Sequence, residues 1–189
     1  IVQWVKDATG AQGQPMRINS DHVFAGGYSN GGMLSYRLIC QASDVFKGAG
    51  PACGSYFGNR VPGFTCSPAN ARPVVHLHGT ADFVVPYSSS LSSYVRYATG
   101  VAGCPSTTTT IFTNPAYWGM TCFQRAPCSG LSSTQRGSVW CQYTGLGHVW
   151  PTNGLLRMWN YWTTGRLSLD TNSSALLGAA TPLDPSAGK

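Results

Sequence analysis

The sequence predicts an α/β fold built on a mostly parallel sheet. Short apolar runs bounded by glycine or proline, typical of buried strands, alternate with stretches that repeat apolar residues at helical spacing. The chain of 189 residues has the length of one domain, and its 42% hydrophobic residues supply a packed core. Strands that alternate with helices are typical of parallel sheets, because parallel neighbours need a crossover connection.

The expected elements follow one another along the chain. Residues 1–9 have the pattern of a helix end, and residues 10–20 have the composition of a loop. Strands are expected in DHVFAGG (21–27), VFKGAGPA (45–52), PVVHLHG (73–79), TTTTIFT (107–113) and SVWCQYTG (138–145). Helices are expected over residues 30–41, from Pro86 to Tyr97, and over LLRMWNYW (155–162); proline is favoured at the first helical position. Residues 166–189 shift to serine, alanine, leucine, threonine and proline, and we interpret them as a tail.

Charge and composition exclude several function classes. Only 10% of the residues are charged, and the basic residues behind the net charge of +6 are scattered along the chain. A nucleic-acid-binding protein is expected to cluster its basic residues, so we expect no nucleic-acid partner. No apolar run reaches the roughly 18 residues that a membrane span requires, so we expect no membrane partner.

Cysteine use indicates an oxidising compartment. The chain has seven cysteines but no C-x-x-C pair, which argues against a zinc ribbon and against a thioredoxin-type site. Disulfides are the better interpretation, and they are typical of secreted proteins. We therefore expect an extracellular protein.

A serine between two glycines joins an expected strand to an expected helix. The segment Gly27-Tyr28-Ser29-Asn30-Gly31 matches the G-x-S-x-G pattern, in which side chains at the glycine positions would collide with neighbouring elements. A base must take the serine proton before the hydroxyl can act as a nucleophile. We expect Ser29 to be that nucleophile, with the backbone N–H of Asn30 as one oxyanion donor. The competing interpretation is an ordinary glycine-rich turn.

The acidic partner of Ser29 follows by elimination. All six acidic residues are aspartates, and three of them, Asp7, Asp170 and Asp184, lie in the first helix or the tail. Asp21 and Asp44 precede strands, which places them at the end of the sheet away from Ser29. Only Asp82 follows a strand, so only Asp82 shares the carboxyl edge of the sheet, where open parallel sheets place their sites.

The same reasoning selects one histidine of four. His22 enters a strand at the far end of the sheet, while His76 and His78 lie within a strand, on one face of it, as packing or hydrogen-bonded core residues. His148 follows the last strand in a glycine-rich loop that can direct an imidazole inward. Serine, aspartate and histidine then occur in the chain order of an α/β-hydrolase. His148 is expected to be the base, and Asp82 is expected to hold its imidazole.

Three segments together resemble a known family: GGYSNGGMLSYRL, VVHLHGTADFVVPY and GLGHVWP. They are similar to extracellular esterases described as poly(3-hydroxybutyrate) depolymerases or as feruloyl and acetylxylan esterases, of the family-one carbohydrate esterases. The resemblance runs over about residues 1–165 and implies a catalytic domain of α/β-hydrolase fold there. It implies ester hydrolysis through an acyl-enzyme on Ser29, with Asp82 as acid and His148 as base, and with neither cofactor nor metal.

The resemblance leaves the substrate open among feruloyl esters, acetyl esters and short poly(hydroxyalkanoate) chains, so the expected partner is an ester on a polysaccharide or polyester. Tyr28 and Trp150 lie beside the nucleophile and the base in the sequence. Aromatic walls suit a feruloyl ring or a polymer surface, so both are candidates for substrate contact. Packing is an equal alternative for both. A function of another class is a non-catalytic fragment or pseudoenzyme with a binding or scaffold role.

The resemblance also suggests two disulfides, Cys104–Cys128 and Cys122–Cys141. A third, Cys40–Cys66, is within reach because a helix end and a strand start lie together at the far end of the sheet. Cys53 is left over, either free or paired outside this chain. Each bridge is expected to stabilise the fold by roughly 2–5 kcal/mol.

An α/β-hydrolase usually has further strands before its nucleophile, and one oxyanion donor comes from that part. Only 28 residues precede Ser29, so we interpret residues 1–165 as the C-terminal part of a longer enzyme. The strand that ends at Ser29 is then expected at the sheet edge, with its outer side unpaired and an apolar face uncovered. The 189 residues alone are expected to be poorly soluble and nearly inactive.

Overall fold

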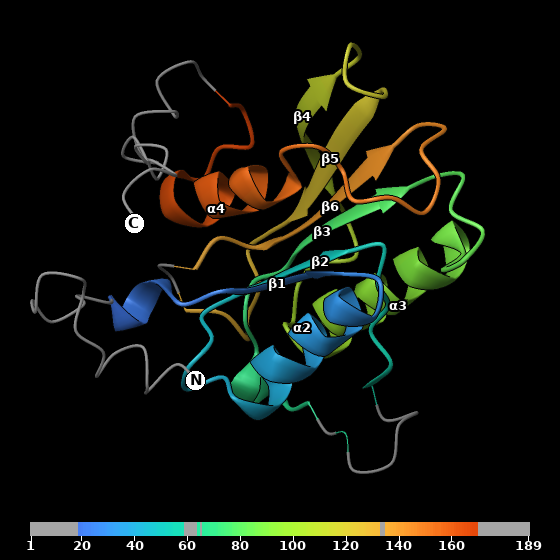
Figure 1. Cartoon of the computed structure of the whole chain (residues 1–189). Coiled ribbons are helices and arrows are strands. Elements are labelled where there is room, and N and C mark those ends of the chain that lie inside the picture. Colours follow the sequence, from blue (N-terminus) through green and yellow to red (C-terminus); the bar gives the residue numbers. More distant parts are fainter. Residues whose placement is uncertain (1–18, 59–63, 65, 133–134, 170–189) are drawn as a thin grey trace, which may run out of the picture.

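The computed structural model describes residues 19–58, 64, 66–132 and 135–169, which form a six-stranded sheet with helices on both faces (Figure 1). The strands are β1 (Ala25–Tyr28), β2 (Ala49–Ala52), β3 (Val75–Gly79), β4 (Thr109–Asn114), β5 (Met120–Arg125) and β6 (Ser138–Tyr143). The helices are α2 (Asn30–Gln41), α3 (Tyr87–Gly100) and α4 (Gly154–Thr164), with 3-10 turns η1 (Ser20–His22) and η3 (Pro68–Asn70).

The order of strands in the sheet is β1-β2-β3-β6-β5-β4. Strands β1, β2, β3 and β6 pair in parallel, whereas β5 and β4 add antiparallel pairs beyond β6. This confirms the mostly parallel α/β fold that the sequence predicts. Strand β5 was not predicted, because the segment MTCFQR has no continuous apolar run.

Several predicted boundaries shift in the structure. Helix α2 covers residues 30–41 as expected, but β1 begins at Ala25 rather than at Asp21. The reason is a local cap: the Asn19 side chain accepts a hydrogen bond from the Asp21 N–H and starts the turn η1. Helix α3 begins at Tyr87, with Pro86 as the residue that precedes the first turn.

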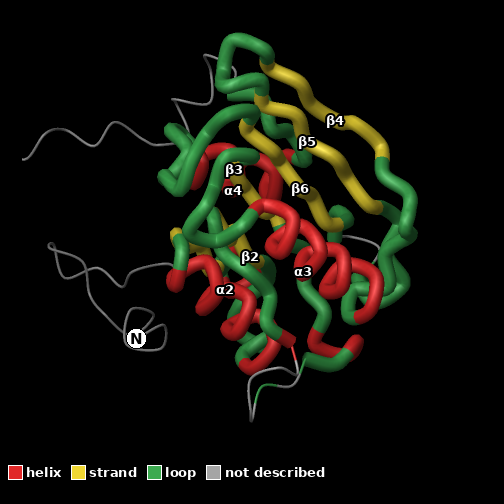
Figure 2. Tube along the Cα trace, turned by 90° about the vertical axis from the view of Figure 1, so that its right-hand side faces the viewer, coloured by secondary structure: helices red, strands yellow, loops and turns green. Residues whose placement is uncertain are grey.

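Helices α2 and α3 cover one face of the sheet, and α4 covers the other (Figures 1 and 2). Each interface has its own core. The core on the side of α2 and α3 is rich in aromatic side chains, which include Tyr36, Tyr94, Tyr97 and Trp140. On the α4 side, Leu77 and other buried residues of the central strands pack with Met158 and Tyr161. Alternation along β3 therefore sends its odd-numbered residues toward α4 and its even-numbered residues toward α2 and α3.

Strand β1 forms one edge of the sheet in the described part of the chain and pairs only with β2 there, as expected. The expectation of an uncovered face is wrong in part. Helix α2 packs on one face of β1, where a Cβ on Gly27 would meet the backbone of Gly31. On the other face, Leu155 of α4 reaches Gly26, which is exposed.

Three disulfides join Cys40 to Cys66, Cys104 to Cys128 and Cys122 to Cys141, with Cα separations of 4.8, 3.9 and 4.0 Å. These are the pairs that the sequence and the resemblance indicated. The last bridge links paired positions of β5 and β6. Cys53 is free and buried.

The predicted helix end over residues 1–9 and the predicted tail from residue 170 onward lie outside the described residues. Within the described part, Leu167 is buried, and its carbonyl accepts a hydrogen bond from Arg157 of α4. None of the described helices combines the length and the apolar character needed to cross a membrane.

Candidate active site

Ser29 lies on a sharp turn between β1 and α2. Its backbone adopts φ 54° and ψ −118°, a region that non-glycine residues rarely occupy. The Ser29 N–H donates to the Ala52 carbonyl at 2.8 Å, and the Ser29 carbonyl accepts from Met33 in the first turn of α2. The strained backbone is therefore held by the neighbouring strand and by the helix. Strain of this kind presents the hydroxyl clear of the chain.

Gly27 and Gly31, which flank Ser29, differ in how closely other atoms approach them. A Cβ on Gly27 would lie 2.4 Å from the carbonyl group of Gly31, so no side chain fits there. A Cβ on Gly31 would meet nothing within 4 Å, which corrects the expectation that its own side chain would collide. Instead, the helix backbone at Gly31 crowds Gly27. The next residue, Gly32, is the tighter position on the helix, because its Cβ would lie 3.0 Å from the Ala52 carbonyl.

The structure brings together the three side chains singled out in the sequence. His148 Nε2 lies 3.0 Å from Ser29 Oγ, and His148 Nδ1 lies 2.8 Å from Asp82 Oδ2. A carboxylate only accepts hydrogen bonds, so Nδ1 carries the proton and Nε2 is free to accept from the serine hydroxyl. This is the protonation pattern that a general base next to a serine requires.

The carboxylate of Asp82 is almost fully buried, with 3% of the residue exposed. Its Oδ1 accepts from the N–H groups of Val84 and Val85, each at 2.9 Å. Burial raises the pKa of Asp82, but hydrogen bonds from His148 and Val85 and the neighbouring imidazoles outweigh it, so the pKa is lowered overall. Asp82 is therefore an ionised, fixed acceptor for His148.

The loop that carries His148 follows β6 and is tied down on both sides. The Tyr28 hydroxyl donates to the His148 carbonyl at 2.7 Å, and the Ala81 N–H donates to the Leu146 carbonyl at 3.0 Å. A Cβ on Gly79 would lie 2.1 Å from the Leu146 carbonyl oxygen, so glycine at the end of β3 is what lets the loop approach. These contacts hold the imidazole between Ser29 and Asp82.

The other predicted residues have distinct places. Asn30 is the first residue of α2, where helix N–H groups lack an intrahelical partner, so its N–H is available beside Ser29 Oγ. The Tyr28 ring packs 4.9 Å from the His148 ring and 6.3 Å from Trp150, measured between centroids. Tyr28 thus has a structural contact through its hydroxyl, and Trp150 is 36% exposed.

The buried histidines lie as the sequence indicated, on the same face of β3, and both are fully buried. Burial lowers the pKa of His76 well below its ordinary value, and the neighbouring His78 adds to the effect. Burial likewise lowers the pKa of His78, against the opposing influence of the Val85 carbonyl and Asp82. Both imidazoles are therefore neutral near pH 7.

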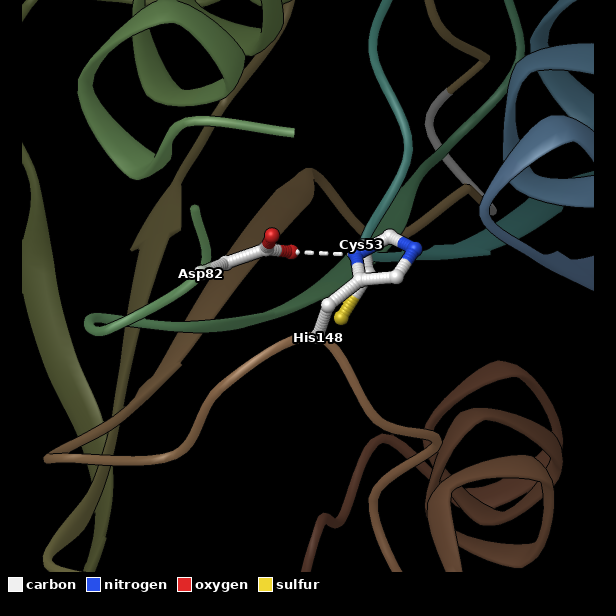
Figure 3. A group of neighbouring side chains, drawn as sticks. All are labelled: Cys53, Asp82 and His148. Carbon is white, nitrogen blue, oxygen red and sulfur yellow. Dashed lines mark hydrogen bonds and ion pairs between the residues drawn. The ribbon is translucent and has the colours of Figure 1, made fainter. Parts of the chain in front are cut away.

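Cys53 adjoins Asp82 and His148, which sequence reasoning did not foresee (Figure 3). Ligand atoms of Cys53, Asp82 and His148 lie within 4.8 Å of one another, the spacing of a possible metal site. Burial, reinforced by Asp82, raises the pKa of the Cys53 thiol to about 12, and the thiol donates to the Val149 carbonyl at 3.4 Å. A metal would need the thiolate and the unprotonated Nδ1 of His148. The donor set therefore fits a protonated hydrogen-bonded cluster better than a metal centre.

Sequence comparisons find esterases among the relatives. The chain is 34% identical to feruloyl esterase B of Piromyces equi over 79 residues, which cover 42% of this chain and 15% of that protein. It is 25% identical to a bifunctional acetylxylan esterase/xylanase of Neocallimastix patriciarum over 193 residues, covering 98% of this chain and 27% of that protein. The chain thus spans less than a third of either relative. No protein-family model matches it.

Solved structures give the fold. The acetyl xylan esterase of Aspergillus awamori aligns with a TM-score of 0.54 at 18% identity, covering 74% of this chain and 59% of that one. SOBER1 of Arabidopsis thaliana aligns with a TM-score of 0.51 at 18% identity, covering 80% and 56%. The chain has the α/β-hydrolase fold. In sequence, the chain resembles feruloyl and acetylxylan esterases, while the likeness to poly(3-hydroxybutyrate) depolymerases stays an expectation.

The arrangement can carry out acyl transfer. A hydroxyl, an imidazole and an ionised carboxylate stand in a hydrogen-bonded line, next to a helix N-terminus that favours negative charge. Sequence reasoning missed the contacts that position this line, made by Cys53, Tyr28 and His78. The one signal for His78 was its spacing of two residues from His76, which places both rings on one face of a strand.

Proposed function

We propose that this chain is an esterase that hydrolyses carboxylic esters through Ser29, His148 and Asp82. The observation that carries the proposal is the hydrogen-bonded line of 3.0 and 2.8 Å from the Ser29 hydroxyl through His148 to Asp82. His148 takes the Ser29 proton as the hydroxyl attacks the ester carbonyl, and Asp82 stabilises the imidazolium. The alcohol leaves with a proton from His148, and water releases the acyl group by the same route in reverse.

The negative charge that develops on the carbonyl oxygen would be stabilised by the Asn30 N–H. That group is at the N-terminus of α2, where backbone donors are free and the helix dipole favours an anion. The strained backbone at Ser29 supports this role, because it directs the hydroxyl and the following N–H toward one point.

As substrates we propose feruloyl or acetyl esters of plant polysaccharide, as the names of the two esterase relatives suggest. Exposed apolar side chains adjoin the proposed triad in the sequence: Phe83 and Val84 follow Asp82, and Val149 and Trp150 follow His148. Such a surface suits an aromatic acyl group or a polymer. Together with three disulfides, a polymeric substrate favours an extracellular location.

Turnover of a panel of esters tests the proposal. Methyl ferulate, p-nitrophenyl acetate, acetylated xylan and poly(3-hydroxybutyrate) would be compared, with Ser29→Ala as the matched control. We expect hydrolysis of at least one of the first three and its loss in Ser29→Ala, because no other nucleophile faces His148 Nε2 in the described structure. Turnover of the polyester alone would move the substrate to polyesters. A folded protein that shows neither turnover nor labelling of Ser29 by a fluorophosphonate would favour a non-catalytic role.

A further inference from the structure

A chain of buried hydrogen bonds continues from the candidate active site into the aromatic core. His78 Nε2 lies 3.2 Å from Asp82 Oδ2 and 2.9 Å from the Val85 carbonyl oxygen. On the same face of β3, His78 Nδ1 lies 3.1 Å from His76 Nε2, and His76 Nδ1 lies 2.9 Å from the Tyr36 hydroxyl. The residues whose side chains form this line of polar contacts are each at most 3% exposed: Tyr36, His76, His78 and Asp82.

The partners of these nitrogens fix the direction of every hydrogen bond. Both neighbours of His78 Nε2 are acceptors, so Nε2 carries the proton, and Nδ1 of the neutral ring must accept. His76 Nε2 therefore donates to His78, and His76 Nδ1 accepts from the Tyr36 hydroxyl. Ser90 agrees with this assignment, because its hydroxyl donates to the Gly54 carbonyl and faces His76 Nε2 as an acceptor at 3.3 Å.

We propose that His78 is a positioning residue for the hydrolysis. Its Nε2–H donates to the Val85 carbonyl, with Nε2 3.2 Å from Asp82 Oδ2, and so holds the turn of residues 82–85 where Oδ2 accepts the Nδ1–H of His148, while His76 fixes the tautomer of His78. This inference rests on the proposed function, since the position of Asp82 matters to the reaction only if His148 is the base. His78 acts through Asp82 and touches neither Ser29 nor His148 by a hydrogen bond. Asp82 Oδ2 thus accepts from His148 and lies 3.2 Å from His78 Nε2, while Oδ1 receives the two backbone donors.

A role in packing would require a different property of His78. The His78 ring stacks on Trp140 at a centroid distance of 5.5 Å and an interplanar angle of 14°, and Tyr87 meets it edge-on at 6.1 Å. Packing requires an aromatic ring at position 78, whereas positioning requires an N–H at the place of Nε2. The two requirements can be separated by substitution.

Two substitutions of His78 test the two requirements separately. His78→Gln keeps an N–H donor at nearly the Nε2 position but has no ring, whereas His78→Phe keeps the ring but has no donor. We expect His78→Phe to lower kcat on p-nitrophenyl acetate by roughly 10-fold with KM unchanged, because the buried Val85 carbonyl loses its donor and Asp82 loses the N–H that faces Oδ2. His78→Gln is expected to stay close to the unsubstituted protein. Equal kcat in all three proteins, or a better His78→Phe than His78→Gln, would overturn the proposal.

The pH dependence of kcat/KM is a second measurement, which a role of His78 in packing alone would not change. The titratable groups that face His78 are His76 on β3, Asp82 after it, His148 after β6 and Tyr87 at the start of α3. Without the Nε2–H, Asp82 holds more charge toward His148 and stabilises its cation. In His78→Phe the low-pH limb of kcat/KM therefore moves to higher pH, and in His78→Gln it does not. An unchanged limb in His78→Phe contradicts the proposal.

Imidazole ¹⁵N NMR tests the hydrogen bonds independently of activity and of either variant's folding. We expect His76 and His78 to be neutral and protonated at Nε2, and His148 to be protonated at Nδ1 at neutral pH. A His78 protonated at Nδ1 would overturn the proposal. Titration of Ser29 with a fluorophosphonate counts active sites for the kinetics. Absent labelling would be a failure of the proposed function, whereas the tautomer of His78 would still decide whether its N–H faces the Val85 carbonyl and Asp82.

Discussion

The two faces of strand β3 serve different purposes although they share one backbone. Val75 and Leu77 point toward α4 into a core where they pack against apolar neighbours such as Met158. His76 and His78 point toward α2 and α3, equally buried, and form a directed line of hydrogen bonds that ends at the Val85 carbonyl, with Asp82 Oδ2 3.2 Å from His78 Nε2. Burial alone therefore does not distinguish a packing position from one that supports the site. The hydrogen-bond partners do.

Buried side chains on the two faces of β3 also affect the stability of the protein in different ways. An apolar side chain on the α4 face contributes to stability through contact and burial. An imidazole on the other face must be desolvated and is retained only if each nitrogen finds a partner. We expect substitutions on the α4 face to change the free energy of unfolding, and substitutions along the polar line to change kcat.

Asp82→Asn is expected to have the largest effect, a loss of about 10⁴-fold in kcat. The N–H groups of Val84 and Val85 require an oxygen at the Oδ1 position, so the amide nitrogen would take the Oδ2 position. That nitrogen donates to His148 Nδ1 and moves the imidazole proton to Nε2, where it can no longer accept from Ser29. Steady-state turnover of p-nitrophenyl acetate measures the loss. A decrease of less than about tenfold would show that Asp82 does not set the tautomer.

Leu77→Ala tests the opposite face of β3. It removes a fully buried side chain from the α4 core, and the free energy of unfolding is expected to fall by about 2–5 kcal/mol. Turnover per labelled active site should be unchanged, because Leu77 has no hydrogen bond to the polar line. Urea unfolding and active-site titration give the two values. A large loss of kcat in fully folded protein would mean that the two faces are coupled.

Stability should fall as the pH falls, because of the two buried histidines. Burial lowers the pKa of His76 and His78 in the folded protein, so below about pH 6.5 the unfolded chain binds protons that the folded chain does not. The stabilisation is therefore full above that pH and declines below it, by up to about 1.4 kcal/mol per pH unit for each histidine. The lowered pKa of Asp82 acts in the same direction at more acidic pH.

Urea unfolding between pH 8 and pH 5 measures this slope. The double variant His76→Gln, His78→Gln is the control, and its stability should depend less on pH over the same range. A free energy of unfolding that is flat or rises toward pH 5 in the unsubstituted protein would contradict neutral, buried histidines.

Cys53→Ala is expected to have the smallest effect, a loss of about 1 kcal/mol in the free energy of unfolding. The thiol is a buried, weak donor to the Val149 carbonyl, next to His148. Cys53→Ser keeps a donor of similar size and should lose less. Urea unfolding of both variants measures the difference. Equal losses would show that Cys53 only fills space.

How well the sequence predicts the site differs from residue to residue. Ser29, Asp82 and His148 could be selected because each follows a strand, and the carboxyl ends of parallel strands meet at one edge. The role of Gly31 was misjudged because the collision depends on the angle between α2 and β1, which no local pattern encodes. Strand β5 was missed because its pairing comes from β6 and β4 rather than from its own composition.

The contacts that surround Ser29, Asp82 and His148 were harder to predict from the sequence. The spacing of His76 and His78 indicates a shared face, but the direction of their hydrogen bonds depends on acceptors from other segments, the Val85 carbonyl and Asp82. Cys53 comes from the end of β2 and reaches the His148 loop, 96 residues away at Val149, only through the packing of the sheet. Such partners are set by tertiary structure.

The central claim, that Ser29 is the activated nucleophile, is tested most directly by labelling with a fluorophosphonate and mapping the adduct by mass spectrometry. Cleavage after Arg17 and Arg37 gives one peptide that contains Ser20, Ser29 and Ser35. We predict a single adduct on this peptide, at Ser29, which is absent in Ser29→Ala and forms much more slowly in His148→Gln. An adduct at another residue, or equal labelling of Ser29→Ala, would contradict the account.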